Sequence, residues 1–422
     1  MLHSGISRIV FLAALGSALL LSRARATVVA GPFQEDPSRE VAASKTVQVK
    51  AARTPTETQR ALLAFAVDAA EVVPASGGYE KDRARLQELV VGAFIEIGSF
   101  EQAESCAARI ANWRGASACA DIAIAMARAG DAVSAKRIAA LALRDAASTL
   151  EWQAQRVRVK VAQANAILGL DEEAARLEAG VGEPEQGKVA AVRASRLDDA
   201  AFDAQMKLLG GWIATKNFDL VRNASVVYAE LFRASQGNKE RRRMITAGVA
   251  AANERLPLDI RIGNLLALAQ ISVEQGDTCG GREWIEAAEH SFAAAAWLPT
   301  DAIVQRTRLG IARLASGNAV HGREHLQAAL LLYDTNRDQI VDIDRASALR
   351  SIAVAYAKSL RVTEAHSCFL RAIEDGSTNP NARPRAEDLV QTCLAITLCR
   401  LEPDARMWSK LRSIRAGLID PW

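Results

Sequence analysis

One spacing recurs six times along the chain and limits the folds that it can adopt. In each case a large apolar residue is followed by a small one, a helix-breaking turn comes seven positions after the small residue, and another small residue follows five positions later. The apolar and small pairs are Val90-Val91, Ile122-Ala123, Val161-Ala162, Leu268-Ala269, Leu309-Gly310 and Ile352-Ala353. The turns are at Gly98, Gly130, Gly169, Gly276, Gly317 and Leu360, and the later small residues are Ala103, Ala135, Ala174, Gly281, Gly322 and Ala365. Small side chains let two helices approach closely, so each unit is expected to be a packed antiparallel helix pair. One pair cannot bury its apolar face, so the units are expected to stack into an all-α superhelix, or solenoid.

The composition agrees with helices packed through small residues. Half of the residues are apolar (50%) but only 5% are aromatic, and strand-forming residues do not alternate with polar ones. The net charge of +3 gives no general attraction to nucleic acid or to anionic lipid. We therefore expect no nucleic-acid partner.

The N-terminus has the pattern of an export signal. An uncharged run from Ile9 to Leu21 follows Arg8, and Ala24-Arg25-Ala26 has the small-x-small pattern that a signal peptidase reads. The run is shorter than the roughly 20 residues that span a bilayer, which favours a cleaved signal peptide (1–26) over a membrane anchor. The mature chain is therefore expected in the periplasm or outside the cell, with no membrane span after cleavage.

Composition and register divide the rest of the chain. Residues 27–55 contain three prolines and scattered charges without a period, which predicts a disordered tether. N-terminal helical repeats are expected over 56–178 and C-terminal helical repeats with a cap over 259–422. Between them, 179–258 loses the register and is expected to form an irregular helical connector, with helical stretches near 186–208, 209–235 and 239–255.

The spacing resembles that of the tetratricopeptide repeat (TPR), in which two alanines seven positions apart mark the second helix. Four of the six units fit that pair, and the best unit runs from Ala348 through Ala353 and Ala365 to Ala372. Turn-to-turn spacings of 32, 39, 41 and 43 depart from the family period of 34. The resemblance therefore implies TPR-like units that are degenerate and long.

In that family the inner groove of the superhelix binds peptides, through residues six and two positions before each turn. The polar residues that this rule selects here, together with Arg350 of the best unit, are Glu96, Arg128, Gln163, Gln270, Glu274, Arg350 and Lys358. The repeated Lys, Arg and Asn that clamp a terminal carboxylate in some family members are missing. Binding of an extended or helical peptide through apolar contacts is therefore expected.

Two short motifs could bind metal ions. His321, Glu324 and His325 match the H-x-x-E-H string of zinc peptidases, but Gly322-Arg323-Glu324 repeats Gly281-Arg282-Glu283 of the preceding unit and so belongs to the repeat. The segment 334–344 matches several positions of a calcium loop, but Gln339 replaces its turn glycine and Arg345 its bidentate carboxylate. We expect no metal and no cofactor at either, and a helix capped by Asp342 or Asp344 after the loop.

Cysteine and tryptophan give weaker indications. Of the six cysteines, Cys106 and Cys119 flank one turn between units and are the favoured candidates for a disulfide in an oxidising compartment. The tryptophans follow no evident spacing and are expected to fill the core, except Trp422, which could be an exposed anchor at the chain end.

These observations predict a non-enzymatic scaffold that binds a protein or peptide partner in the cell envelope. Two alternatives remain open. Helix stacks also occur in sugar-processing and peptidoglycan-associated proteins, although these need a committed acid and sugar subsites rich in aromatic residues. The other alternative is a structural component of a surface assembly, which residues 27–55 would attach.

Overall fold

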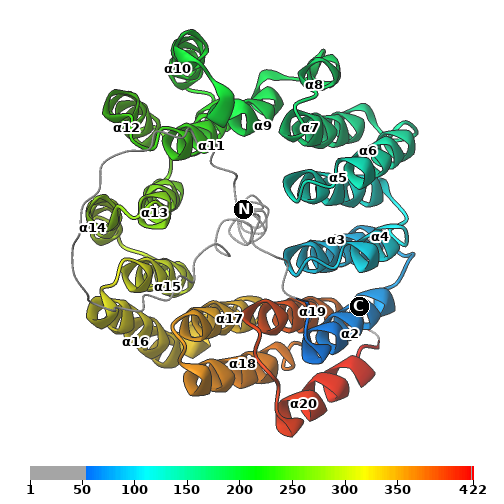
Figure 1. Cartoon of the computed structure of the whole chain (residues 1–422). Coiled ribbons are helices and arrows are strands. Elements are labelled where there is room, and N and C mark those ends of the chain that lie inside the picture. The colour runs from blue at the N-terminus through cyan, green and yellow to red at the C-terminus, as the bar shows by residue number, and fades with distance from the viewer. Residues whose placement is uncertain (1–53, 420) are drawn as a thin grey trace, which may run out of the picture. The chain divides into compact units, whose positions relative to one another are not determined.

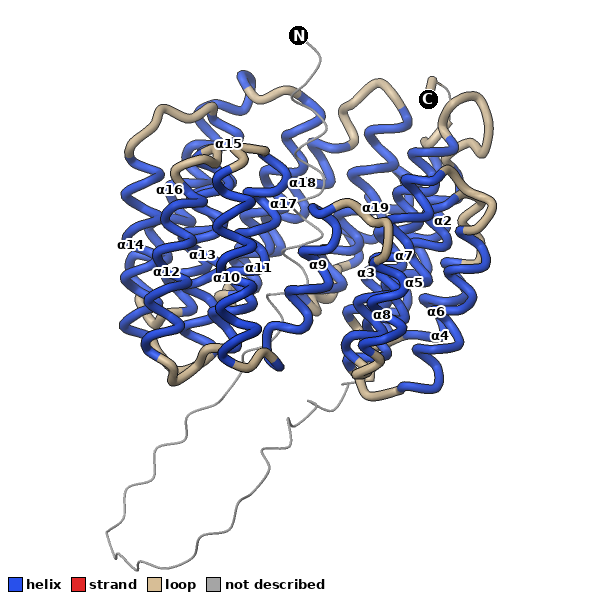
Figure 2. Tube along the Cα trace, turned by 90° about the horizontal axis from the view of Figure 1, so that it is seen from above, coloured by secondary structure: helices blue, strands red, loops and turns tan. Residues whose placement is uncertain are grey.

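The computed structural model describes residues 54–419 and 421–422, which contain helices and no strand (Figure 2). The expected signal peptide and nearly all of the expected tether lie outside the described residues. Pro55–Trp422 forms one compact unit. No helix in this described part has both the length and the apolar character that crossing a bilayer requires.

Helices in this unit alternate between two layers, as Figure 1 shows. The inner helices are α3 (Glu80–Glu96), α5 (Trp113–Arg128), α7 (Glu151–Ile167), α9 (Glu183–Arg193), α11 (Phe218–Ala234), α13 (Leu258–Glu274), α15 (Pro299–Ala315), α17 (Asp342–Lys358) and α19 (Ala382–Cys399). The outer helices are α2 (Glu57–Val72), α4 (Phe100–Ala107), α6 (Ala132–Ala146), α8 (Asp171–Glu178), α10 (Asp199–Ala214), α12 (Lys239–Asn253), α14 (Thr278–Ala293), α16 (Ala319–Asn336) and α18 (Val362–Gly376). A last helix, α20 (Ala405–Ala416), lies outside α18 and α19. The chain is therefore an all-α solenoid of antiparallel helix pairs, as its sequence predicts.

The turns of the repeat have the backbone that the sequence implies. The five turn glycines have φ between 76° and 84°, and Leu360 takes the same left-handed conformation with φ 63°. Gly310 and Gly322 illustrate the role of the small residues, because a Cβ atom on Gly310 would lie 3.1 Å from the carbonyl oxygen of Gly322 and 2.7 Å from the side chain of Leu326. Helices α15 and α16 can approach this closely only without side chains at these two positions.

The stretch 179–258 continues the alternation with α9 to α12, although two predicted helix boundaries in it are wrong. The expected helix over 186–208 is interrupted by a 3₁₀ turn at Ala194–Arg196, because Asp198 caps α10 by accepting a hydrogen bond from the Ala201 amide (2.8 Å). The expected helix over 209–235 ends at Ala214, and Lys216 adopts a left-handed conformation (φ 60°) before α11 begins. Single residues thus end helices at places where the apolar pattern of the sequence continues without interruption.

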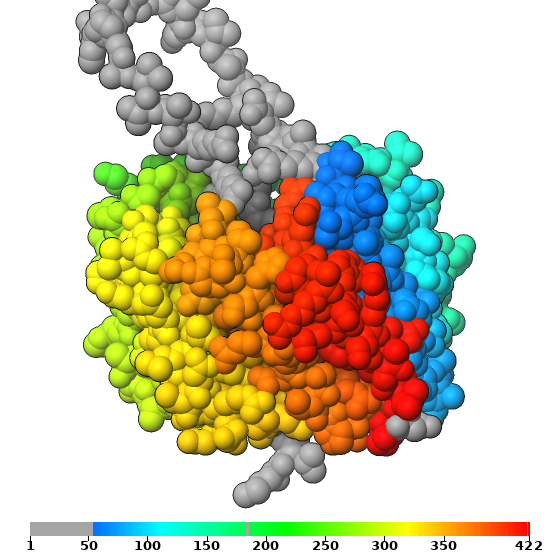
Figure 3. Space-filling view, turned by 90° about the horizontal axis from the view of Figure 1, so that it is seen from below, coloured from blue at the N-terminus to red at the C-terminus, as the bar shows by residue number. Residues whose placement is uncertain are grey.

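The inner helices close into a ring, because α3 packs on both α5 and α19. The first outer helix, α2, packs against α19 and so supplies the outer partner of the last inner helix. Its side chains Leu62, Leu63, Ala66, Ala69 and Ala70 are fully buried. Figure 3 shows the N-terminal (blue) and C-terminal (red) helices in contact on the surface of the unit.

Polar contacts also join the N-terminal and C-terminal helices where the ring closes. Arg85 and Glu387 form a bidentate ion pair with N–O distances of 2.8 and 2.7 Å, and the Gln59 amide donates to the Thr397 carbonyl (3.0 Å). The hydrogen bond that Arg85 donates to Glu387 outweighs the effect of burial and raises the pKa of Arg85. The closure is thus specified by side chains more than 300 positions apart in the sequence.

Candidate functional site

Three of the predicted groove residues are half-buried and make polar contacts, two of them to a neighbouring helix. Gln163 on α7 donates to the carbonyl oxygen of Lys188 on α9 (2.9 Å). Gln270 donates to Glu274 one turn later on α13 (2.8 Å), and Glu274 pairs with Arg233 of α11 (2.5 Å). The structure therefore brings Gln270 and Glu274 together, and Glu274 links α13 to α11.

Glu96, Arg128 and Lys358 lie at the C-terminal ends of three inner helices. Glu96 is half-buried, whereas the side chains of Arg128 and Lys358 are exposed. Desolvation by the surrounding protein disfavours the charged form of Lys358 and lowers its pKa. The nearby Cys399 opposes this effect only in part. Arg128 and Lys358 can therefore contact a partner, while Glu96 is only partly accessible.

Arg350 lies between α17 and α19 and not on the surface of a groove, which corrects the prediction for this residue. Its guanidinium donates to Asp388 (2.9 Å), Gln391 (2.9 Å) and Thr392 (3.3 Å). Burial raises the pKa of Asp388, against the opposing effect of Arg350. The positive charge of Arg350 thus compensates the negative charge of the buried Asp388 carboxylate.

A cluster of two tryptophans and two arginines lies at the N-terminal ends of α5 and α7. Trp113 and Trp152 meet edge to face with ring centroids 5.3 Å apart, and half of Trp152 (50%) is exposed. The guanidinium of Arg114 lies 5.1 Å from the Trp113 ring, and that of Arg156 lies 5.6 Å from the Trp152 ring. Exposed tryptophan and arginine are the residues that most often dominate binding at protein interfaces. We refer to Trp113, Arg114, Trp152 and Arg156 as the Trp–Arg cluster.

A chain of polar contacts continues from this cluster along α3, α5 and α7. Glu88 of α3 pairs with Arg114 and accepts a hydrogen bond from Ser117 of α5 (3.1 Å). Lys160 of α7 donates to Ser117 (2.7 Å) and to Asp121 (2.6 Å). Helices α4, α6 and α8 cover the outer side of α3, α5 and α7 (Figure 1), so we infer from the partial exposure of Glu88, Asp121 and Lys160 that this polar stripe faces the inner side of the ring.

The sequence contains a signal for the Trp–Arg cluster that the prediction missed. Trp113 and Trp152 stand the same number of positions before Gly130 and Gly169, and so occupy equivalent places in two successive units. The expectation for Trp422 is wrong, because that residue is half-buried against Tyr79, whose hydroxyl donates to its carbonyl oxygen (2.8 Å). An exposed tryptophan is thus found by its place in the repeat and not by its place at the chain end.

The histidines of the zinc-like motif make separate contacts. His321 is exposed and lies 3.0 Å from Asn318, while His325 lies 3.1 Å from Glu289 of α14. Burial disfavours the charge of Glu289, but hydrogen bonds from Arg313 and His325 outweigh this and lower its pKa to about 2. Among the described residues, no group of three or more His, Cys, Asp and Glu side chains is placed to hold a metal ion.

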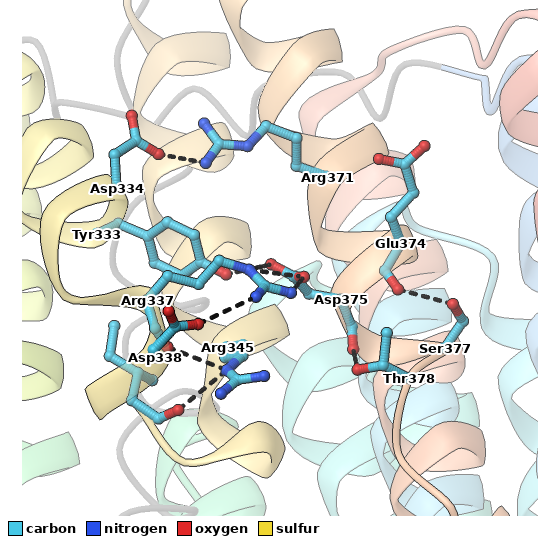
Figure 4. A network of polar contacts seen from close by, with 11 residues as sticks. Tyr333, Asp334, Arg337, Asp338, Arg345, Arg371, Glu374, Asp375, Ser377 and Thr378 are labelled. Atoms are coloured by element: carbon cyan, nitrogen blue, oxygen red, sulfur yellow. Dashed lines mark hydrogen bonds and ion pairs between the residues drawn. The ribbon is translucent and has the colours of Figure 1, made fainter.

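Two acidic residues of the calcium-like segment, Asp334 and Asp338, have separate partners, as Figure 4 shows. Asp334 points toward Arg371 of α18 and pairs with it, whereas Asp338 lies beside Arg337. Arg337 and the buried Tyr333 hydroxyl both donate to Asp375. The expected cap of α17 is not formed by a side chain, because Val341 is the N-cap and the two aspartates lie in the first turn.

All six cysteines are free thiols in the structure, including the pair Cys106 and Cys119. Burial raises the pKa of each of these two thiols to about 11, and that of Cys393 to about 12. Cys279 is exposed. Apart from Cys279 and the half-buried Cys399, the cysteines are buried among the packed helices.

Comparison with known proteins gives little beyond this geometry. No protein-family model matches the chain, and neither does any curated protein. One solved structure that the chain resembles is described as a "Circular tandem repeat protein with novel repeat topology and enhanced subunit contact surfaces", at 15% identity over 86% of this chain and 96% of that one. The TM-score of 0.26 is too low to support an argument. The fold rests on the helix contacts given above.

Proposed function

We propose that the chain is an exported, TPR-like scaffold that binds a protein or peptide partner on the inner side of α3, α5 and α7. The observation that carries the proposal is the Trp–Arg cluster, in which Trp152 is half exposed and Arg156 is exposed. A partner segment could bury apolar surface on Trp152 and place a carboxylate on Arg156 at little cost in side-chain ordering, since the two side chains already contact each other.

The export signal and a periplasmic or secreted location belong to the same proposal. They rest on the apolar run before Ala26 and on the small-x-small pattern at 24–26. Binding without catalysis is proposed because the carboxylates of the inner stripe, Glu88 and Asp121, are engaged by Arg114 and Lys160 and hold helices together.

The test is capture of a partner by the mature chain, residues 27–422, from the envelope fraction of its own organism, followed by mass spectrometry and affinity measurement. We expect one dominant protein, whose affinity falls at least about tenfold in Trp152→Ala and in Arg156→Ala. The matched control is Ile343→Ala, because Ile343 is 55% exposed and occupies the place in α17 that Trp152 has in α7.

Three results would contradict the proposal. Equal affinities for Trp152→Ala and wild type would refute the site, and a retained glycan without a protein would support the sugar-processing alternative. A large homo-oligomer that captures nothing would support a structural component.

A further inference from the structure

A pocket of about 530 Å³ opens between α14 and α16, over the N-terminal half of α15. Its walls are formed by Phe292 and Trp297 on one side and by Leu331 and Leu332 on the other, with alanines from all three segments between them. Leu331 is 64% exposed, which is a large exposed fraction for a leucine beside two aromatic rings. We refer to this site as the α14–α16 pocket.

The aromatic wall of the pocket is held in place. The rings of Phe292 and Trp297 are stacked with centroids 5.6 Å apart, and the Trp297 indole donates to the Phe292 carbonyl (2.8 Å). The guanidinium of Arg306 lies 5.3 Å from the Phe292 ring and lines the pocket. Within the part of the chain that the structure describes, Arg306 forms no ion pair.

The chain fills a comparable site with one of its own helices. In Figure 3, α20 (red) lies on the surface between the orange α18 and the blue α2. Met407 and Leu411 of α20 are buried, and Trp408 meets Phe65 of α2 edge to face at 5.9 Å. An amphipathic helix thus covers the junction of two outer helices over α19.

The repeat register shows that the α14–α16 pocket is the same kind of junction. Helices α15 and α19 have equal separations between their first residues, Pro299 and Ala382, and their left-handed turns, Gly317 and Arg400. By this register Ala302, which lines the pocket, corresponds to Arg385 of α19. Arg385 donates to the carbonyl oxygen of Gly417 at the end of α20 (2.9 Å), so the corresponding face of α19 is a helix-docking face.

We propose that the α14–α16 pocket is a docking site for an acidic amphipathic helix of a partner protein. Two apolar residues one turn apart would fill the pocket, as Met407 and Leu411 do in α20. A carboxylate on the same helix would pair with Arg306. The chain's own α20 fits poorly here, because it carries four basic residues (Arg406, Lys410, Arg412, Arg415) and would bring like charge to Arg306. This site opens between two outer helices, and the proposal does not depend on the partner proposed for the inner side.

The test uses the full mature chain and three synthetic fluorescein-labelled helices of about 18 residues, long enough to be helical in part. The first carries Leu at i and i+4 with flanking Glu, the second is identical with Lys in place of Glu, and the third contains the α20 sequence 404–417. Fluorescence anisotropy measures each affinity for wild type, Leu331→Asp and Arg306→Glu. Val133→Asp is the matched control, because Val133 is 82% exposed on another outer helix, α6.

We expect saturable binding of the acidic helix, a loss of at least about tenfold in Leu331→Asp, and no change in Val133→Asp. Arg306→Glu should lower the affinity for the acidic helix about tenfold and favour the basic one. Equal binding of the acidic and basic helices by wild type would overturn the proposal. Tighter binding of the α20 peptide would also overturn it, in favour of a second copy of this chain.

Discussion

Closure of the ring through α2 can be tested by removing one buried side chain from that helix. Leu63 is fully buried in α2, which packs against α19. Truncation of a buried leucine to alanine loses its transfer free energy and leaves a cavity, together about 2–5 kcal/mol. Leu63→Ala should therefore lower the free energy for opening the α2–α19 contact by about 3 kcal/mol.

The assay is native-state hydrogen exchange read by mass spectrometry on peptides from each helix. If α2 completes the last unit, its amides and those of α19 lose protection together, by about a hundredfold for 3 kcal/mol. The reason is that α2 is the outer helix with which α19 makes its most extensive contact, larger than its contacts with α18 and α20.

Ile285→Ala is the matched control, because Ile285 is also fully buried on an outer helix, α14, far along the chain from α2. It should accelerate exchange in α13 and α14 and leave α19 unchanged. Faster exchange in α2 with an unchanged α19 in Leu63→Ala would refute the reasoning, since α2 would then be a peripheral helix and not part of the closure.

Three further perturbations test residues with a structural role. Arg350→Met should lower the free energy of unfolding by about 3–5 kcal/mol, because it leaves Asp388 charged and buried. The double variant with Asp388→Leu should recover most of this loss in urea titrations. A single variant as stable as wild type would contradict the role of the buried pair. Leu360→Gly should raise the free energy of unfolding by about 1 kcal/mol, because glycine adopts the left-handed backbone conformation without strain and the leucine side chain that it removes is already exposed. An unchanged melting temperature would argue against backbone strain at this position. Glu289 has a pKa of about 2 in the folded state, so its ionisation stabilises the fold above the ordinary glutamate pKa and this contribution is lost as the pH falls toward 2. Wild type should therefore be more stable than Glu289→Gln by about 1–3 kcal/mol at pH 6 and by progressively less toward pH 2, and a constant difference between pH 6 and pH 2 would refute the assignment.

The units of the repeat were predictable because their determinants are local. A turn glycine such as Gly317 needs a positive φ, and a close helix approach needs Gly310 and Gly322, so the residue types alone indicate both features. Leu360 shows that register can place a turn even where the residue type does not favour it. The helix boundaries near Asp198 and Lys216 were missed because a single cap or left-handed residue ends a helix without interrupting the apolar pattern.

The site residues were harder to predict, because exposure depends on which helices become neighbours. Arg350 follows the repeat pattern but faces Asp388, a residue of the next inner helix, and pairs with it. Gln270 and Glu274 lie one turn apart on α13 and contact each other, and Arg233 of α11 pairs with Glu274. A register rule thus selects the face of a helix, while the charges on adjacent units decide whether a polar side chain there is free to bind.

Ring closure could not be predicted at all, and it changes what the inner side can do. The contacts that close the ring, such as Arg85 with Glu387, join residues whose pairing no spacing in the sequence suggests. An open solenoid can change its curvature to fit a ligand, whereas a closed one keeps each inner helix between two neighbours. The Trp–Arg cluster is therefore presented on a surface of fixed curvature, so a partner that binds it incurs little cost for ordering the scaffold and must itself match the spacing of α5 and α7.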